Sequence, residues 1–574
     1  MGKKKETKNV WFVNFALRVA GGIHYRKLVK ASKDPRRASE QTLRGILTYA
    51  KDSVYGREHH FEDILRAKDD TELYRLWQQH VHPNDYEDMR PYVERHKQGE
   101  AGVLFPGKPR LYATTSGTTS EPKWIPITEH YLKAVYGKMT KVWLYEFLKN
   151  RPKCFEGGML TIVGKVIEGY APDGTVFGSV SGVTQRDAPG FVKALYTNPP
   201  EVFMISDYNA RYYTLMRMAI ERDVHVIITA NPSTVAEVLK NANRFFDEYI
   251  EDIEHGTLSA KVEIEPEIRA AIAPYLKPNP KRAAELRALK AQHGNVLPKH
   301  YWPDIQILTT WKCGNTKVYL EQFKDAFPPT MLHQEFAYFS SECRFGLVLD
   351  DTNNTVLFPH FHYYEFVAEE ECLEPDFQKK PDLHFLQLHE LQKGKRYCPF
   401  VTTYAGLYRY CMNDLVEASD LFHRTPTVFM VQKINGIVTM TGEKLHEQQF
   451  MKAVRQAADD LKMPVRFFIG FAELATSSYQ FYYEFEDEAM TQADCDRFTV
   501  RVDEILKQMN MEYEAKRVSL RVKDPVGHRL QRNSFEQFKA RCIAEGARDG
   551  QFKLMLLMQD EGRHAKFKDL TVGE

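Results

Sequence analysis

Hydrophobic residues recur along this chain at the spacings of both helices and strands. In the first hundred residues, apolar positions three and four apart, as in Gln41–Ala50, predict helices. In 101–430, short β-rich runs such as Val224–Thr229 alternate with helical stretches such as Arg211–Ile220 and Thr234–Tyr249. This alternation is typical of α/β layers.

The last part of the chain, 431–574, has a different pattern. Its segments predict a small α+β domain that begins with a turn at Asn435-Gly436. The elements expected after the turn are helix His446–Leu461, strand Val465–Phe471, strand Tyr479–Phe485, helix Ala493–Gln508 and strand Arg517–Val522. The chain therefore divides into a large domain, 1–430, and a smaller one, 431–574.

Composition excludes several classes of protein. The 574 residues are 43% hydrophobic and 27% charged, which is ordinary for a globular chain. Lys plus Arg number 78 and Asp plus Glu number 77, so the net charge is +1 and nucleic acid is not an expected partner. Residues 1–50 depart from this balance, because their 12 basic and 3 acidic residues give the segment a net charge of +9. The rest of the chain then has a net charge of −8.

The segment Val10–Lys30 mixes aromatic and basic residues, and two interpretations are open. It could rest on an anionic membrane surface, or it could be a helix docked on its own core with a solvated basic end, which we favour. No apolar run approaches the roughly 20 residues that span a bilayer. The eight cysteines lack C-x-x-C spacing, so we expect neither a disulfide framework nor a structural zinc site. We also expect a cytoplasmic location and a monomer.

The most informative segment for chemistry is Tyr112–Thr128. Six hydroxyl residues surround Gly117, and Lys123 follows them. Glycine permits close backbone approach, and successive N–H groups and hydroxyls can then wrap an anion. The composition alone is equally compatible with a Ser/Thr-rich surface turn.

The order of residues in this loop carries more information than its composition. Thr115-Ser-Gly-Thr-Thr-Ser-Glu-Pro-Lys123 resembles the phosphate loop of acyl-adenylating enzymes, and Ile125-Pro126-x-Thr128 resembles the branch of Gretchen Hagen (auxin-responsive) acyl-acid amido synthetases. One departure is Ser120, which stands where the pattern has a second glycine. The resemblance implies that the loop and lysine bind ATP phosphates; the residues concerned are Thr115, Ser116, Gly117, Thr118, Thr119 and Lys123.

Tyr338-Phe-Ser-Ser-Glu342 resembles the family's Y-x-S-S-E motif. The resemblance implies that Tyr338 stacks on adenine, that Ser341 contacts phosphate and that Glu342 is a catalytic residue and the Mg²⁺ ligand. Carboxylate oxygen suits that hard cation. Taken alone, the segment fits a buried tyrosine near a helix N-cap.

Thr403–Asp414 resembles the family's Y-A-G-L-Y-R-Y-R-V-G-D, which makes Asp414 the expected ribose ligand. Cys411 replaces an arginine of that pattern and Asn413 replaces its glycine. Asparagine tolerates a left-handed backbone better than most residues, so we expect the turn to form.

Two further stretches resemble family motifs. Trp302–Gly314 resembles a wall of the adenine pocket, with Gly314 in its turn, although a buried strand and turn explains it equally well. Gly546–Lys553 resembles the C-terminal motif whose lysine, here Lys553, enters the active site for adenylation. Tyr212 and Tyr213 are candidate contacts for an aromatic or apolar acid.

The resemblance covers nearly the whole chain and implies a fold and a reaction. The fold is α/β, with a large adenylation domain (β-barrel plus α/β layers) and a mobile C-terminal lid. The reaction uses ATP and Mg²⁺ to convert a carboxylic acid to an acyl-AMP, and then transfers the acyl group to an amine, such as an amino acid. Transfer to a thiol such as coenzyme A, or a degenerate nucleotide-binding protein, are the alternatives.

His360 and His362 are one more candidate pair. On a strand they would share a face and could hold a metal, but aromatic packing within Phe358–Tyr364 is the favoured interpretation.

Overall fold

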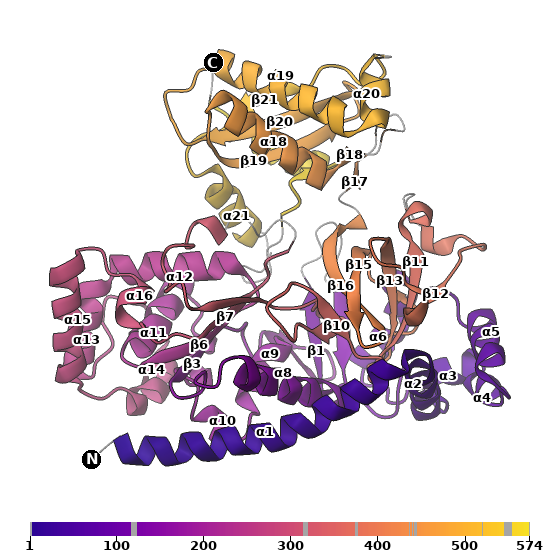
Figure 1. Cartoon of the computed structure of the whole chain (residues 1–574), viewed down its shortest axis with the longest axis horizontal. Helices are drawn as coiled ribbons and strands as arrows, with labels where there is room; N and C mark the ends of the chain where they lie inside the picture. Colours follow the sequence, from indigo (N-terminus) through magenta and orange to yellow (C-terminus); the bar gives the residue numbers. More distant parts are fainter. Residues whose placement is uncertain are drawn as a thin grey trace. The chain divides into compact units, whose positions relative to one another are not determined.

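The chain forms two compact units in the computed structural model (Figure 1). The structure describes residues 3–115, 123–313, 320–372, 377–434, 437–438, 440, 443, 445–518, 520–544 and 554–572. The first unit comprises Met1–Ala368, Gln378–Met412 and Glu417–Met430. The second comprises Glu369–Phe377, Asn413–Val416 and Val431–Glu574.

Helices make up the start of the first unit, as the apolar spacing predicts. Asp34 caps the second helix by accepting a hydrogen bond from the Arg37 N–H at 3.2 Å, and Pro35 takes its first position. Among the described residues, no helix is both long enough and apolar enough to span a bilayer. The helices are α1 (Lys3–Lys33), α2 (Pro35–Ala50), α3 (Val54–Glu58), α4 (Phe61–Leu65), α5 (Asp70–His80) and α6 (Tyr86–Lys97).

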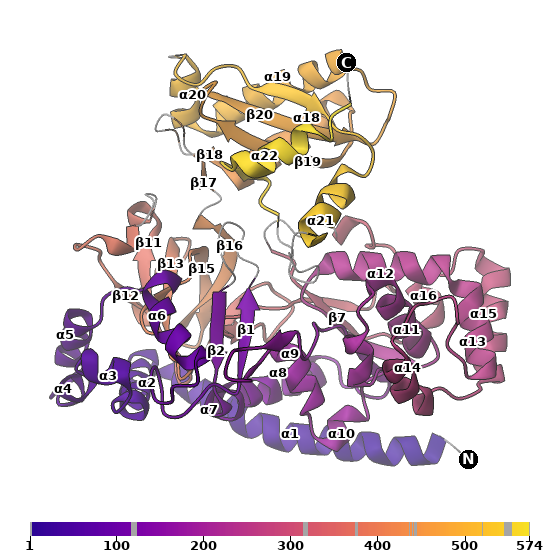
Figure 2. The same cartoon turned by 180° about the vertical axis from the view of Figure 1, so that it is seen from behind.

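The long helix α1 packs along α8 (Gly137–Asn150), as both views of the molecule show (Figures 1 and 2). A Cβ atom on Gly21 would lie 2.4 Å from the Cβ atom of Tyr145 and 2.5 Å from the carbonyl oxygen of Lys141. Glycine therefore permits the close approach of the two helices. The docked-helix interpretation of this segment is confirmed for this face of α1.

A four-stranded parallel sheet, in the order β3-β6-β7-β8, lies in the middle of the first unit. Three of its four strands are almost entirely buried, which is typical of parallel sheets. The strands are β3 (Gly158–Thr161), β6 (Val224–Ile228), β7 (Ile307–Thr310) and β8 (Leu332–Glu335). The helices of this part of the chain are α11 (Tyr208–Ile220), α12 (Pro232–Arg244), α13 (Phe246–His255), α14 (Pro266–Ile272), α15 (Pro280–His293) and α16 (Pro298–Tyr301).

The carboxyl ends of these strands meet at one edge, where α/β proteins commonly bind ligands. Glu335, the last residue of β8, accepts a hydrogen bond from the backbone N–H of Lys312 at 2.6 Å. Burial raises the pKa of Glu335 to about 7. The carboxyl group thereby anchors the segment that follows β7.

Two more sheets complete the first unit. A four-stranded sheet has the order β2-β1-β5-β4, and an eight-stranded sheet has the order β12-β11-β13-β15-β16-β10-β9, with β14 paired to β13. Together with the parallel sheet they confirm the predicted α/β class. The strands are β1 (Leu111–Thr115), β2 (Lys123–Ile127), β4 (Gly169–Tyr170), β5 (Val176–Phe177), β9 (Gly346–Leu347), β10 (Thr355–Leu357), β11 (Tyr363–Ala368), β12 (Leu386–Gln387), β13 (Arg396–Thr402), β14 (Tyr410–Cys411), β15 (Asp414–Phe422) and β16 (Thr425–Lys433).

A buried ion pair ties the eight-stranded sheet to the N-terminal helices. Arg409 Nε donates to Glu365 Oε2 at 3.0 Å, and each side chain is only 2% exposed. Trp77 Nε1 donates to the same carboxylate oxygen at 3.1 Å, and Arg409 also donates to the Val81 carbonyl at 2.9 Å. Arg409 has a φ of 40°, so these contacts hold the backbone in a left-handed conformation just before β14.

The second unit has the mixed α+β content that the sequence predicts. Its main sheet has the order β21-β20-β19-β22, and β17 pairs with β18. The strands are β17 (Ile437–Val438), β18 (Leu445–His446), β19 (Val465–Glu473), β20 (Ser478–Phe485), β21 (Val526–Arg529) and β22 (Leu557–Met558). The helices are α18 (Glu447–Leu461), α19 (Gln492–Met509), α20 (Met511–Val518), α21 (Ser534–Ala544) and α22 (Glu561–Lys568).

The strand expected at Arg517–Val522 is wrong, because the chain is helical to Val518. Arg517 is buried and donates to both carboxylate oxygens of Asp503, at 2.8 and 2.9 Å, which fixes the end of α20 on α19. The alternation that suggested a strand leaves Val518 and Leu520 exposed at 75% and 78%. The turn expected at Asn435-Gly436 lies outside the described residues.

Two smaller expectations in the first unit also change. The single helix expected at Thr234–Tyr249 is two helices, which meet at Phe245. His360 and His362 precede β11 instead of lying on a strand, and the His360 ring lies 4.2 Å from that of Phe361. Burial lowers the pKa of both histidines to about 3, in agreement with the packing interpretation.

We predict that Glu365→Leu lowers the free energy of unfolding by about 4 kcal/mol, because Arg409 would remain buried without its carboxylate. Urea unfolding measures the change. The control is Glu417→Leu, whose ion pair with Arg396 at 3.1 Å is partly exposed, and which should cost about 1 kcal/mol or less. Equal losses in the two variants would contradict the anchoring role.

We also predict a pH-dependent difference between the wild type and Glu335→Gln. The pKa of Glu335 rises from 4.5 to about 7 on folding, so the unfolded chain binds fewer protons between these values. Relative to the variant, the wild type should lose about 3 kcal/mol of stability as pH rises from 4.5 to 7. Urea unfolding across this range tests it. The exposed Glu321→Gln is the control, and a flat difference for Glu335→Gln would contradict the raised pKa.

Candidate functional site

The predicted phosphate loop connects two paired strands. Thr115, the last residue of β1, lies opposite Lys123, the first residue of β2, in an antiparallel hairpin. Trp124 N–H donates to Tyr86 Oη at 2.6 Å, which holds the start of β2 against α6. The residues between the strands lie outside the described part of the chain, and they include the candidates Ser116, Gly117, Thr118 and Thr119 and the departure Ser120.

Two polar residues from distant parts of the sequence meet beside this hairpin, and the charge of a third acts on one of them. Lys123 Nζ donates to Tyr410 Oη at 3.5 Å, and the same ammonium lies 5.8 Å from the centroid of the Tyr86 ring. Burial raises the pKa of Tyr410 well above its usual value, and the carboxylate of Glu342 raises it further. A cation and a phenol are therefore in contact, and the charge of a carboxylate acts on the phenol.

Tyr410 is the member of this group that we did not predict. The tyrosine belongs to the Tyr-Arg-Tyr run of the motif that ends at Asp414, and this run was the available signal. It lies on β14, directly after Arg409, so the buried ion pair with Glu365 fixes its position.

Glu342 lies at the tip of a closed turn. Ser340 N–H donates to the Cys343 carbonyl at 3.0 Å, and Cys343 N–H donates to Ser340 Oγ at 3.3 Å. Ser341 and Glu342 lie between these anchors and are half-buried. The turn therefore presents a hydroxyl and a carboxylate on neighbouring residues.

Packing holds both sides of the turn. On one side, the Tyr338 ring stacks on Phe345 with centroids 4.1 Å apart, and Tyr338 N–H donates to Thr355 Oγ1 at 2.9 Å. On the other side, Arg344 N–H donates to Tyr131 Oη at 3.2 Å.

Thr128, which ends the Ile-Pro-x-Thr signature, supports this arrangement indirectly. Its hydroxyl accepts the Tyr131 N–H at 2.9 Å and caps the short helix α7 (Glu129–Tyr131). Since Tyr131 Oη binds the backbone beside Glu342, the signature after the phosphate loop also positions the acidic turn.

The departures in the third motif have clear structural outcomes. Asn413 has a φ of 53°, which confirms that asparagine takes the left-handed position where the family pattern has glycine. Cys411 is buried, and its Sγ lies 3.7 Å from that of Cys398. Two packed cysteine side chains therefore occupy the place where the family pattern has an arginine. Asp414 begins β15 and is buried; it belongs to the second unit.

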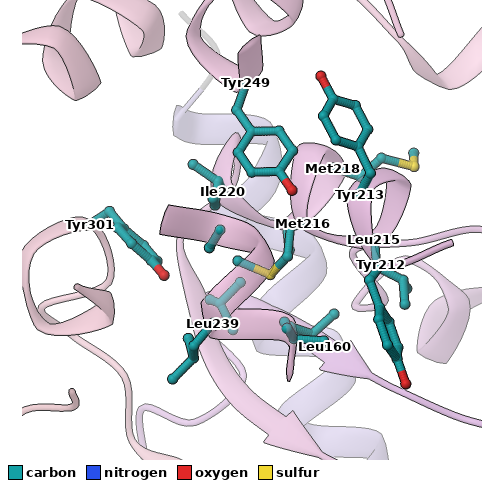
Figure 3. Close-up of a cluster of buried hydrophobic side chains, with 14 of the residues drawn as sticks. Leu160, Tyr212, Tyr213, Leu215, Met216, Met218, Ile220, Leu239, Tyr249 and Tyr301 are labelled. Carbon is teal, nitrogen blue, oxygen red and sulfur yellow. The ribbon is translucent and has the colours of Figure 1, made fainter. Parts of the chain in front are cut away.

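The two tyrosines proposed for acid binding lie on α11 and point in different directions (Figure 3). Tyr213 Oη donates to Asp252 Oδ2 at 2.6 Å inside the hydrophobic core, so its hydroxyl has a structural partner. Tyr212 points away from Tyr213 and is 8% exposed. A contact of either residue with substrate stays a prediction.

Trp302 also belongs to the core. Its indole Nε1 donates to the Arg222 carbonyl at 3.0 Å, and the side chain is buried. Trp302 itself follows α16, and the buried strand expected in this stretch is β7. Gly314 and Lys553 lie outside the described residues, and within those residues no group of three or more His, Cys, Asp or Glu side chains could hold a metal.

Comparison with known families places almost the whole chain. The GH3 family N-terminal domain matches residues 24–332, the central domain 355–433 and the C-terminal domain 448–562. An indole-3-acetic acid-amido synthetase, GH3.10 of Arabidopsis thaliana, is 23% identical over 91% of this chain and 92% of its own length. A jasmonoyl–L-amino acid synthetase, GH3.5 of Oryza sativa subsp. japonica, is 24% identical over 80% of this chain and 81% of its own.

Solved structures share the fold. The acyl acid amido synthetase AtGH3.15, in complex with 2,4-DB, superposes with a TM-score of 0.79 at 18% identity and covers 96% of both chains. A 2-hydroxyisobutyryl-CoA ligase with bound 2-HIB-AMP gives a TM-score of 0.52 at 11% identity, over 93% of this chain and 91% of its own. Since the N-terminal profile alone matches more than half of the residues, the chain belongs to the GH3 family.

Proposed function

We propose that this protein is an ATP-dependent ligase that adenylates a carboxylic acid, releases pyrophosphate and transfers the acyl group to an amine such as an amino acid. The observation that carries the proposal is the contact of Lys123 with Tyr410 beside the hydroxyl-rich hairpin, where the charge of Glu342 also acts on Tyr410. The amido synthetase names of the full-length relatives support the same reaction.

The formation of an amide from a carboxylic acid requires a site that activates the carboxylate. A carboxylate does not acylate amines at neutral pH because its oxide is a poor leaving group. Attack by a carboxylate oxygen on the α-phosphorus of ATP forms the acyl–AMP anhydride and breaks the bond to pyrophosphate. The amine then attacks the acyl carbon and AMP leaves. Both steps need neutralised phosphate charge and reacting atoms held in line.

We assign the nucleotide contacts as follows. Lys123 and the loop would hold phosphate oxygens, and the Tyr410 phenol, neutral because its pKa is raised, would donate a hydrogen bond beside them. Tyr338 would stack on adenine, Ser341 would contact phosphate, and Asp414 would accept hydrogen bonds from ribose hydroxyls. Thr115 begins the phosphate loop, and we assign Gly314 to the wall of the adenine pocket.

Mg²⁺ fits the acidic turn. This ion is commonly held by one or two carboxylates together with substrate phosphates, and Glu342 supplies one half-buried carboxylate. When bound, the ion would neutralise phosphate charge.

The second unit would act as the mobile lid. In the domain division proposed from the sequence, 1–430 and 431–574, Lys553 belongs to the smaller domain. This lysine would enter the site for adenylation. Closure of such a lid excludes water from the reactive adenylate. A cytoplasmic location and a monomeric state stay predictions.

A pyrophosphate-release assay tests the proposal. The protein is mixed with ATP, Mg²⁺ and a panel of aromatic and aliphatic acids, with and without amino acids. We expect acid-dependent pyrophosphate release and an amide product. Thioester formation with coenzyme A in place of amide would favour a thiol acceptor, and the absence of ATP turnover with every acid would exclude adenylation.

We predict that Glu342→Gln lowers kcat for acid-dependent pyrophosphate release about a hundredfold, because a charged ligand of the phosphate-bound metal is lost. The Mg²⁺ concentration needed for half-maximal rate should rise in the same assay. Glu321→Gln, an exposed carboxylate, is the matched control. An unchanged rate and Mg²⁺ requirement for Glu342→Gln would exclude the assigned role.

We predict that Tyr338→Ala raises the KM for ATP about tenfold and leaves the KM for the acid unchanged, since base–aromatic stacking contributes about 1–3 kcal/mol. Tyr338→Phe keeps the ring and should behave like the wild type. A parallel rise in both KM values would show that the change disturbs the whole site and not adenine stacking.

A further inference from the structure

Helix α1 has apolar side chains on two opposite faces. One face packs on the protein through Val13, Leu17 and Leu28, which are at most 3% exposed. The other face carries large apolar side chains that remain in solvent. They are Trp11, Phe12, Phe15, Val19 and Ile23, exposed at 68%, 54%, 53%, 49% and 42%.

The exposed residues form a continuous surface. Trp11, Phe15, Val19 and Ile23 follow one another at intervals of four, which places them along one side of a helix. The Trp11 and Phe15 rings stack with centroids 5.5 Å apart, and Phe12 meets the edge of Phe191 at 6.3 Å. Large exposed apolar patches on proteins mark sites of association.

Positive charge continues the same side of the helix. Positions three or four residues beyond Ile23 carry Arg26 and Lys27, and the next steps carry Lys30 and Lys33. From Val10 to Lys33 the helix contains five basic residues, the fifth being Arg18, and no acidic residue; all five are exposed. The side therefore passes from aromatic to cationic.

We propose that this side of α1 binds the surface of an anionic lipid bilayer, with the aromatic half in the headgroup layer and the cationic half on lipid phosphates. Helices that lie at membrane interfaces typically have a Trp- and Phe-rich face beside Lys and Arg. Each basic residue near an anionic surface adds to the attraction. A second copy of this face fits less well, because five like charges would meet five more. The sequence pattern of Val10–Lys30 alone leaves both interpretations open, and the two faces of α1 allow docking and lipid binding together.

Vesicle co-sedimentation of the full chain tests the proposal. Vesicles that contain phosphatidylglycerol should bind the protein, and pure phosphatidylcholine vesicles should bind it much more weakly. Trp11→Ser combined with Phe15→Ser should weaken binding about tenfold or more. Arg26→Glu combined with Lys30→Glu should weaken it about a hundredfold, and raised salt should act in the same direction.

Matched controls keep the test independent of folding and net charge. Tyr170→Ser with Tyr275→Ser removes two aromatic side chains, 62% and 56% exposed, and should leave binding unchanged. Lys240→Glu with Lys261→Glu makes the same charge change elsewhere and should also leave it largely unchanged. Equal binding to both vesicle types, or equal effects of test and control variants, would overturn the proposal. Self-association that Trp11→Ser with Phe15→Ser abolishes, without vesicle binding, would assign the face to a second copy instead.

Discussion

A buried ion pair between Arg409 and Glu365 holds the chain in the conformation on which the candidate site depends. Both side chains are almost fully shielded from water, so each charge requires the other, and Trp77 adds a hydrogen bond from the N-terminal helices. The pair keeps Arg409 at a positive φ and delivers Tyr410 to Lys123. The buried ion pair thereby fixes the position of the Tyr410 side chain beside Lys123 in the candidate site.

Much of the fold could be predicted from the sequence, because local pattern and tertiary structure agree. Strand β6 is a short, mostly apolar run, and α18 and α19 show helical periodicity, so burial reinforces what each of these segments favours by itself. The order of the motifs likewise predicted the family. Asn413 is one example at the level of a single residue. Because asparagine tolerates the left-handed conformation, the turn at this position could be expected from the sequence.

What the sequence could not supply depends on distant partners. Arg517 binds Asp503 and keeps α20 helical where alternation favours a strand. The position of Tyr410 depends on the ion pair between its neighbour Arg409 and Glu365, which lie 44 positions apart in the sequence. No local sequence pattern predicts this pair. Both faces of α1 carry apolar side chains, and the packing against α8 shows which of them is buried.

The central claim is that a carboxylate oxygen attacks the α-phosphorus of ATP in this site. The most direct measurement follows that oxygen. The acid that gives the fastest pyrophosphate release is supplied with heavy oxygen in its carboxyl group, together with ATP and an amino acid, and the nucleotide product is analysed by mass spectrometry. The account predicts AMP that carries one heavy oxygen. Unlabelled AMP, or ADP as the product, would contradict it.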